Sequence, residues 1–191
     1  MKFNLLSDNI IFQKFFTIKE RILNYDHFDG SRSKDVIRFI IDKGPAVASI
    51  LYLKDIDKYV FVEQLRAPLT LIDKENPWIM EIVAGTIDGN DTPRFTAEKE
   101  IHEEAGFLID ELTLLQKIYL TPGISTELVY LYYATALSTR KTPTGDPEDE
   151  EEDIKLHYLT IEEVKSKVDA GEFIDAKTAL AAHYIVRRHG G

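Results

Sequence analysis

The amino-acid sequence predicts an α/β fold in which helices cover a mixed sheet. Apolar runs typical of strands alternate along the chain with segments that carry helix start and stop signals. Several consecutive strands are separated by short turns, which predicts hairpins and therefore antiparallel pairs within the sheet. With 191 residues, of which 44% are hydrophobic, the chain can form one domain of ordinary size, alone or with a small appendage.

The first 85 residues are predicted to form strands, because apolar and β-branched residues dominate several short runs there. A turn is expected at Asp29, Gly30 and Ser31, and a hairpin turn at residues 55–57. The predicted strands cover residues 10–18, 21–28, 35–42, 46–53, 58–65 and 77–85.

The first helix is predicted from Thr92 to about Ala105. Thr92 suits the N-cap position, and Pro93 suits the first helical position. Gly106 follows as the usual residue at a helix end.

The remainder of the chain is predicted to add three strands and two helices. Thr160 and Glu163 form a capping box for a helix that ends near Ala170. The last helix is expected over residues 174–188. The side chains expected to face inward from it are Ala179, Ala182 and Ile185. The strands cover residues 112–120, 128–137 and 154–159.

The formal charge of the chain is -10, from 23 Lys and Arg against 33 Asp and Glu. Residues 98–104 contribute -3 and residues 146–153 contribute -7, so the excess lies in two short segments. This charge argues against general binding to nucleic acid or an anionic membrane, because their phosphates would be repelled. It allows metal cations, and phosphate where cations bridge to it.

The absence of cysteine excludes disulfides, thiolate nucleophiles and zinc–thiolate sites. The first residues show no signal-peptide pattern, since Asp8 interrupts the apolar run. The longest uncharged stretch of the second half, residues 128–139, is too short to span a bilayer. We expect a soluble, cytoplasmic protein.

Glu100, Glu103 and Glu104 are predicted to share one side of the first helix, because they are three and four residues apart. One interpretation is an ordinary solvated helix face. The other is a site for a hard cation, because converging carboxylates supply the oxygen ligands that Mg²⁺ or Mn²⁺ prefers. The spacing alone leaves both interpretations open.

The stretch GTIDGNDTPRFTAEKEIHEEAGF, residues 85–107, resembles the Nudix box, G-x5-E-x7-R-E-U-x-E-E-x-G-U, in which U is a bulky apolar residue. Two positions differ, because Asp91 stands where the box has its first Glu and Lys99 where it has Arg. In the family those two residues mainly brace the loop and the helix. The matching positions are Gly85, Glu100, Ile101, Glu103, Glu104, Gly106 and Phe107.

The segments that flank the box resemble the ADP-ribose pyrophosphatase branch, which includes hydrolases of GDP-mannose and other nucleoside diphosphate sugars. They are VEQLR at 62–66, PWIMEIVAG at 77–85 and YLTPGISTE at 119–127. The resemblance implies a Nudix-type α/β/α sandwich with a mixed sheet over residues 44–191. It also implies a small amino-terminal β subdomain over residues 1–43, swapped between the two chains of a homodimer.

The resemblance further implies a metal site with two to three Mg²⁺ or Mn²⁺ ions. Glu100, Glu104 and Glu152 would hold them, with help from Glu103 and from the carbonyl group of Ala84. The EEEDI stretch at 150–154 is similar to one that the branch places over the metal site, and it makes Glu150 the candidate general base. Within this run of acids, the base can be a neighbouring residue instead.

The substrate-binding candidates also follow from the resemblance. Phe15 would stack on the nucleobase with Arg38 nearby, and Arg66 would lie near the diphosphate, as Arg suits phosphate. Phe15 can equally be a core residue of a strand, and the two arginines can be surface ion pairs. The other candidates are Glu81, Pro122 and Glu127, of which the two acids can also be ordinary strand-end residues.

The activity implied is metal-dependent hydrolysis of the diphosphate bond of a nucleoside diphosphate sugar. ADP-ribose, cleaved to AMP and ribose 5-phosphate, is the expected substrate, and GDP-mannose or another such sugar is the alternative. A non-catalytic sensor of nucleotide sugars is a rival of another class. A decapping or nucleoside-triphosphate hydrolase shares the box but not the flanks.

Overall fold

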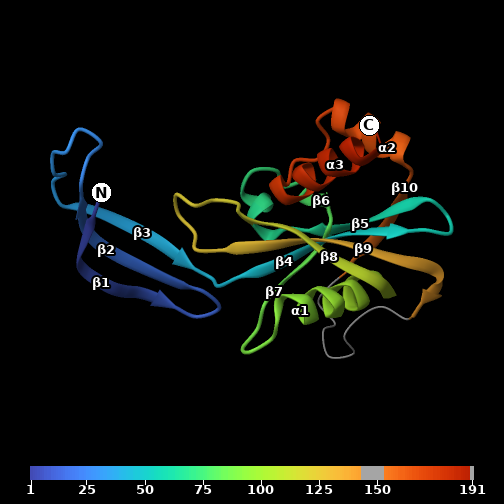
Figure 1. Ribbon diagram of the computed structural model, residues 1–191, viewed down its shortest axis with the longest axis horizontal. Coiled ribbons are helices and arrows are strands. Elements are labelled where there is room, and N and C mark those ends of the chain that lie inside the picture. Colours follow the sequence, from blue (N-terminus) through green and yellow to red (C-terminus); the bar gives the residue numbers. More distant parts are fainter. Residues whose placement is uncertain (143–152, 190–191) are drawn as a thin grey trace. The chain divides into compact units, whose positions relative to one another are not determined.

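The computed structural model describes residues 1–142 and 153–189 (Figure 1). The chain forms two compact units. The amino-terminal unit comprises Met1–Pro45 and Tyr119–Leu128, and the larger unit comprises Ala46–Ile118 and Val129–Gly191.

The amino-terminal unit contains a three-stranded antiparallel sheet in the order β1-β2-β3. The prediction of one strand over residues 10–18 is wrong, because the chain turns at residues 14–16. The apolar side chains of Phe15 and Phe16 in this turn extend the apolar run and hide the turn in the sequence. The strands are β1 (Phe3–Gln13), β2 (Thr17–Tyr25) and β3 (Val36–Asp42).

Residues 124–126 run along the end of β3. The amide of Ile41 donates to the carbonyl of Ile124 at 2.8 Å, and the amide of Thr126 donates to the carbonyl of Ile41 at 3.0 Å. The hydroxyl of Thr126 also donates to Asp42 Oδ1 at 2.8 Å. The segment 119–128 is therefore attached to the amino-terminal unit, although it lies between two strands of the larger unit.

The larger unit contains a mixed sheet, as predicted. β4 and β9 are parallel, whereas β4 and β5 are antiparallel. The path is β10-β5-β4-β9-β8, with β6 paired to β5 and β7 paired to β4. The predicted strand 77–85 is in fact two strands that meet at Ile82 and pair with different neighbours. The strands are β4 (Ala46–Leu53), β5 (Lys58–Leu65), β6 (Trp78–Glu81), β7 (Val83–Thr86), β8 (Phe107–Tyr119), β9 (Leu128–Lys141) and β10 (Lys155–Leu159).

Helices cover both faces of this sheet: α1 lies on one face, and α2 and α3 lie on the other (Figure 1). The predicted α/β/α sandwich is therefore confirmed. The capping box of α2 is present, as Thr160 and Glu163 exchange bonds of 2.8 and 3.3 Å. No helix within the described ranges has both the length and the apolar character needed to cross a membrane. The helical elements are η1 (Ala67–Leu71), α1 (Pro93–Glu100), η2 (Ile101–Ala105), α2 (Ile161–Asp169) and α3 (Ala176–His189).

The two faces of the sheet have separate cores, because alternate residues of a strand point to opposite faces. On the α1 face, Val47 and Leu51 of β4 belong to one buried cluster with Ala97, Ile101 and Ala105. On the other face, the ring of Phe61 stacks on Phe173 with 5.2 Å between the ring centroids. Of the residues predicted to face inward from the last helix, Ala182 and Ile185 are buried and Ala179 is half-buried.

Candidate active site

The glutamates of the box lie on a helix whose second part is a π-helical turn. Thr92 caps this helix by accepting a hydrogen bond from the Phe95 amide at 3.2 Å. The α-helix continues into the π-helical turn η2, which ends at Gly106 in the left-handed conformation, with φ 75°. Such turns recur at functional sites. We call residues 93–105 the box helix.

Strand β7 provides the backbone against which two of these glutamates lie. A Cβ atom at Gly85 would overlap the Glu100 carboxylate, so this approach requires a residue without a side chain. At the preceding residue, the Ala84 amide donates to Glu104 Oε2 at 3.2 Å. The Glu104 side chain is buried, with 7% of the residue exposed. Residues 84 and 85 therefore hold two box carboxylates next to one strand.

Lys99, which replaces the usual Arg, pairs with a glutamate of the box itself. Its Nζ lies 3.6 Å from Glu103 Oε2, one helical turn later. The negative charge of Glu103, followed by that of Glu100, raises the pKa of Lys99. Asp91, the other departure from the box, is exposed, and its amide donates to the carbonyl of Asp88 at 3.0 Å. In the described part of the chain no ion pair joins Lys99 to Asp91.

The donor set of the box helix suits a hard cation. The Glu100 carboxylate lies against Gly85 and the Glu104 carboxylate accepts from the amide of Ala84, so both lie next to β7, and carboxylate oxygens are the ligands that such cations prefer. Within residues 1–142 and 153–189, however, no three His, Asp or Glu side chains form a complete metal-ion cluster. Glu150 and Glu152, the predicted base and further ligand, lie outside the described residues.

Glu81 and Arg66 form an ion pair in the larger unit. Glu81, the last residue of β6, is 2% exposed and accepts from the Nε of Arg66. Its other oxygen accepts from the buried Lys177 ammonium group of α3. Glu81 engages the Nε of Arg66, and the other guanidinium nitrogens make no protein hydrogen bond within the described part of the chain.

Phe15 and Arg38 belong to the amino-terminal unit. Phe15 lies in the turn between β1 and β2 and is 83% exposed, so it is not a core residue of a strand. Its ring makes an edge contact with Phe16, with 6.5 Å between centroids. Arg38 lies on β3 and donates to the carbonyl of Ile37 at 2.8 Å. The Arg38 guanidinium group forms no ion pair within the described part of the chain.

Pro122 and Glu127 lie in the segment that is attached to β3. Pro122 is exposed. The carboxylate of Glu127 is half-buried and pairs with Lys43 Nζ at 2.9 Å. Four of the six substrate candidates therefore belong to the amino-terminal unit, and the other two, Arg66 and Glu81, belong to the larger unit.

The sequence did not indicate the buried partners of Glu81 on α3. Lys177 bonds to Glu81 and, at 3.0 Å, to Asp175, while Thr178 bonds to the Ile82 amide at 3.0 Å. The contact joins residues 96 positions apart, so no local pattern shows it. Asp175 is a good N-cap residue and could have indicated a helix that begins at Ala176, but the helix was predicted to begin at residue 174.

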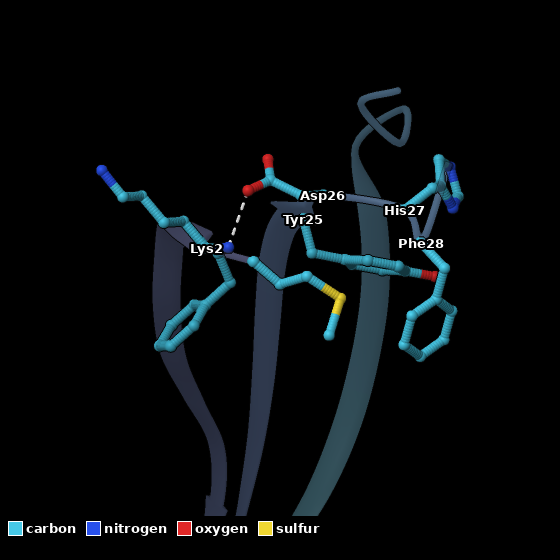
Figure 2. Close-up of a pocket in the computed structure, with 7 residues that line it drawn as sticks. Lys2, Tyr25, Asp26, His27 and Phe28 are labelled. Carbon is cyan, nitrogen blue, oxygen red and sulfur yellow. Dashed lines mark hydrogen bonds between the residues drawn. The ribbon is translucent and has the colours of Figure 1, made fainter. Parts of the chain in front are cut away.

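A pocket of about 520 Å³ lies in the amino-terminal unit, at the end of its sheet (Figure 2). Its rim includes the amide of Lys2, which donates to Asp26 Oδ2 at 2.7 Å, and the rings of Tyr25, His27 and Phe28. None of the residues predicted to bind substrate or metal lines it.

The comparisons with known proteins agree with this arrangement. The NUDIX domain family model matches residues 43–179. An ADP-ribose pyrophosphatase of Bacillus subtilis is 32% identical over 145 residues, which are 76% of this chain and 74% of that protein. A GDP-mannose pyrophosphatase of Citrobacter koseri is 28% identical over 187 residues, which are 96% of this chain and 95% of that protein.

A solved structure described as an ADP compounds hydrolase has the same fold. It superposes with a TM-score of 0.74 over 99% of this chain and 94% of that one, at 19% identity. The predicted resemblance and the predicted fold are thereby confirmed. Since the family model covers most of the sequence, including the box helix and β7, this chain belongs to the Nudix family.

Proposed function

We propose that this protein hydrolyses the diphosphate bond of a nucleoside diphosphate sugar, with ADP-ribose as the substrate and AMP and ribose 5-phosphate as the products. In this reaction water adds to one phosphorus atom, and the bond from that phosphorus to the bridging oxygen breaks. The observation that carries the proposal is the pair of box carboxylates, Glu100 and Glu104, held against residues 84 and 85. The names of the relatives support the substrate class.

Glu100 and Glu104 would hold Mg²⁺ or Mn²⁺, with help from Glu103, Glu152 and the Ala84 carbonyl group. Two to three such ions, when bound, neutralise phosphate oxygens and make a water more acidic. Lys99 balances part of the charge of Glu103 through their ion pair, which leaves Glu100 and Glu104 as the principal ligands. The buried position of Glu104 strengthens its interaction with a cation.

Glu150, or a neighbouring acid of residues 148–153, would accept the proton of the attacking water, and Glu103 is the further catalytic candidate. Arg66 is the candidate partner of the diphosphate. Glu81 holds one side of its guanidinium group, and the remaining nitrogens suit phosphate oxygens. Because the guanidinium group is already held in one orientation, substrate binding costs less conformational entropy.

The residues of the amino-terminal unit would recognise the rest of the substrate. Phe15 offers an exposed ring for stacking on the base, and Arg38, Pro122 and Glu127 lie in the same unit. We further propose that the protein works as a cytoplasmic homodimer with exchanged amino-terminal strands. Multi-angle light scattering should then give twice the chain mass of 21.9 kDa.

The activity is tested with a panel of ADP-ribose, GDP-mannose, UDP-glucose, NADH and diadenosine compounds. Each is offered with Mg²⁺ and with Mn²⁺, and products are identified by chromatography. We expect AMP and ribose 5-phosphate from ADP-ribose at the highest kcat/KM. No hydrolysis of any compound, together with retained nucleotide-sugar binding, would instead favour a sensor.

GDP-mannose is the second candidate substrate. It is favoured by the relative from Citrobacter koseri, which matches 96% of this chain and therefore includes the amino-terminal sheet. The relative from Bacillus subtilis has the higher identity but matches 76% of the chain. A higher kcat/KM for GDP-mannose than for ADP-ribose in the same panel would identify GDP-mannose as the preferred substrate.

A further inference from the structure

The backbone changes its ladder partner at Ile82, just before the strand that holds the box carboxylates. β6 pairs with β5 as far as Glu81, and β7 pairs with β4 from Val83 onward. Ile82 is 1% exposed, so its amide has no access to water. The amide donates instead to the hydroxyl oxygen of Thr178, at 3.0 Å. Because an unpaired buried amide is costly, this bond holds the junction in place.

Asp175 sets the direction of that hydroxyl group. The Thr178 hydroxyl donates its hydrogen to Asp175 Oδ2 at 2.6 Å, and the Thr178 amide donates to the same oxygen at 2.9 Å. The lone pairs of the Thr178 oxygen are therefore left to accept from Ile82. Asp175 thereby also caps α3, since its side chain accepts from the Thr178 amide, and its carbonyl accepts the first bond of the helix from the Ala179 amide at 2.8 Å.

Lys177 holds the residue before the junction. Its ammonium group bonds to both the Glu81 and the Asp175 carboxylates, and its side chain is 10% exposed. The first turn of α3 thus engages two consecutive residues, the side chain of Glu81 and the backbone of Ile82. Both contacts are buried, so water competes poorly for them.

The junction is two residues from the candidate metal site. Ala84 donates its amide to Glu104, and Gly85 leaves the space that the Glu100 carboxylate fills. A shift of the backbone at Ile82 would move both positions, because β7 is only four residues long. Partners that orient a metal ligand affect metal affinity without touching the metal.

We infer that Asp175 and Thr178, with Lys177, are positioning residues: the first turn of α3 fixes β7 in the place where its backbone orients Glu100 and Glu104 for metal binding. This inference rests on the proposed function, because it assigns the box carboxylates to a divalent cation. It adds an element remote in sequence to the determinants of that site, because Thr178 follows Ile82 by 96 residues.

The test replaces Thr178 by Val, which preserves the shape and removes the hydroxyl group. Mn²⁺ affinity of the full-length protein is measured by isothermal titration calorimetry without substrate, together with Tm, kcat and KM for ADP-ribose. We expect Mn²⁺ binding roughly tenfold weaker and a lower kcat at limiting Mn²⁺, with KM for ADP-ribose nearly unchanged at saturating Mn²⁺. Thr178→Ser keeps the hydroxyl and should restore Mn²⁺ affinity.

Thr135→Val is the matched control. Thr135 is 7% exposed on β9, and within the described residues its hydroxyl has no hydrogen-bond partner. The same substitution there removes a buried hydroxyl without touching the junction, so Mn²⁺ affinity should stay at the wild-type value. Asp175→Asn is the second variant, for use if Thr178→Val does not fold. It keeps an oxygen at the N-cap and removes the charge, and it should also weaken Mn²⁺ binding.

Two results overturn the inference in different ways. The inference is contradicted if Mn²⁺ affinity is the same in all three variants, Thr178→Val, Asp175→Asn and Thr135→Val, whatever their Tm. The proposed function would then remain intact. Wild-type protein that binds no Mn²⁺ would contradict the proposed function and the inference with it. Wild-type protein that binds Mn²⁺ but hydrolyses nothing would reject only the proposed substrates, and the Mn²⁺ measurements would still decide the inference.

Discussion

The two units of the chain bury their side chains to very different extents. In the larger unit, Ile50, Phe61 and Phe107 are each at most 1% exposed. In the amino-terminal unit every residue is exposed or half-buried, and Phe3 and Phe39 remain 68% and 53% exposed. Three strands without a buried core gain little stability from their own burial. Exposed apolar side chains on this scale mark an interaction surface, which supports the proposed homodimer.

The candidate metal ligands and most of the candidate substrate-binding residues also lie in different units. Every described candidate metal ligand lies in the larger unit, whereas Phe15, Arg38, Pro122 and Glu127 lie in the amino-terminal unit. Substitutions of these metal ligands should therefore act on turnover and metal binding, whereas Arg66 and Glu81 are the substrate candidates of the larger unit. Substitutions in the amino-terminal unit should act on KM, because interactions equal in ground and transition states change binding alone.

The largest effect is expected from Glu104→Gln in the larger unit. Removing the charge of a principal ligand should lower kcat roughly 10²- to 10³-fold, because the metal ions supply several kcal/mol of transition-state stabilisation. Affinity for a non-hydrolysable substrate analogue should change little. Glu98→Gln is the control, since Glu98 lies on the same helix and pairs with Arg94 at the surface. Full turnover in Glu104→Gln would reject the metal assignment.

Gly85→Ala should have the next largest effect. The added methyl group would overlap the Glu100 carboxylate and displace it, so we expect Mn²⁺ affinity to fall by about 10- to 100-fold. Calorimetric titration with Mn²⁺ measures this, and a thermal melt separates it from unfolding. At Gly123 an added Cβ meets open space, so Gly123→Ala should leave Tm unchanged. Wild-type Mn²⁺ affinity in Gly85→Ala would show that Glu100 can bind metal from another position.

Phe15→Ala tests the role of the amino-terminal unit. Stacking of a base on an aromatic ring contributes about 1–3 kcal/mol, so KM should rise about 5- to 160-fold while kcat stays near the wild-type value. Phe28→Ala removes another ring of the same unit, which is 96% exposed and is not one of the predicted substrate residues. It should leave KM unchanged. A fall in kcat without a change in KM for Phe15→Ala would break the division of roles between the units.

The smallest effect is expected from Asp42→Asn, at the contact between β3 and residues 124–126. Hydrogen bonds from Lys19 and then Thr126 lower the pKa of Asp42 below its ordinary value of 3.8. A carboxylate with a lowered folded-state pKa stabilises the fold above 3.8 and loses this contribution as the pH falls through the folded-state value.

Asp42→Asn should therefore destabilise the fold at neutral pH by at most about 1 kcal/mol, since the ion pair is partly exposed. Hydrogen exchange of the amides at 124–126 across the range from neutral pH to below 3.8 measures the effect. The difference from wild type should shrink toward the acid end. Glu20→Gln on β2, which makes no ion pair within the described part of the chain, is the control. A difference that persists at low pH would assign the effect to packing instead.

Local signals in the sequence predicted most elements of the larger unit. Strands β4 and β5 were predicted at their observed bounds, because their apolar runs are bounded by turn residues. The Thr92 cap and Gly106 located the ends of the box helix. The errors arose where local and tertiary preferences differ. Phe15 and Phe16 form a turn despite their apolar character, and the chain changes its partner strand at Ile82.

The sequence by itself determined the identity of the candidate site, because the box is a contiguous pattern whose glutamate spacing is a property of one helix. Only the tertiary structure decided what holds those glutamates. The approach of Glu100 to Gly85, the bond from Ala84 to Glu104 and the contact of α3 with the β6–β7 junction join segments far apart in the chain. Such contacts depend on which strands and helices pack together, and hydrophobic periodicity indicates the buried face of an element but not the segment that covers it.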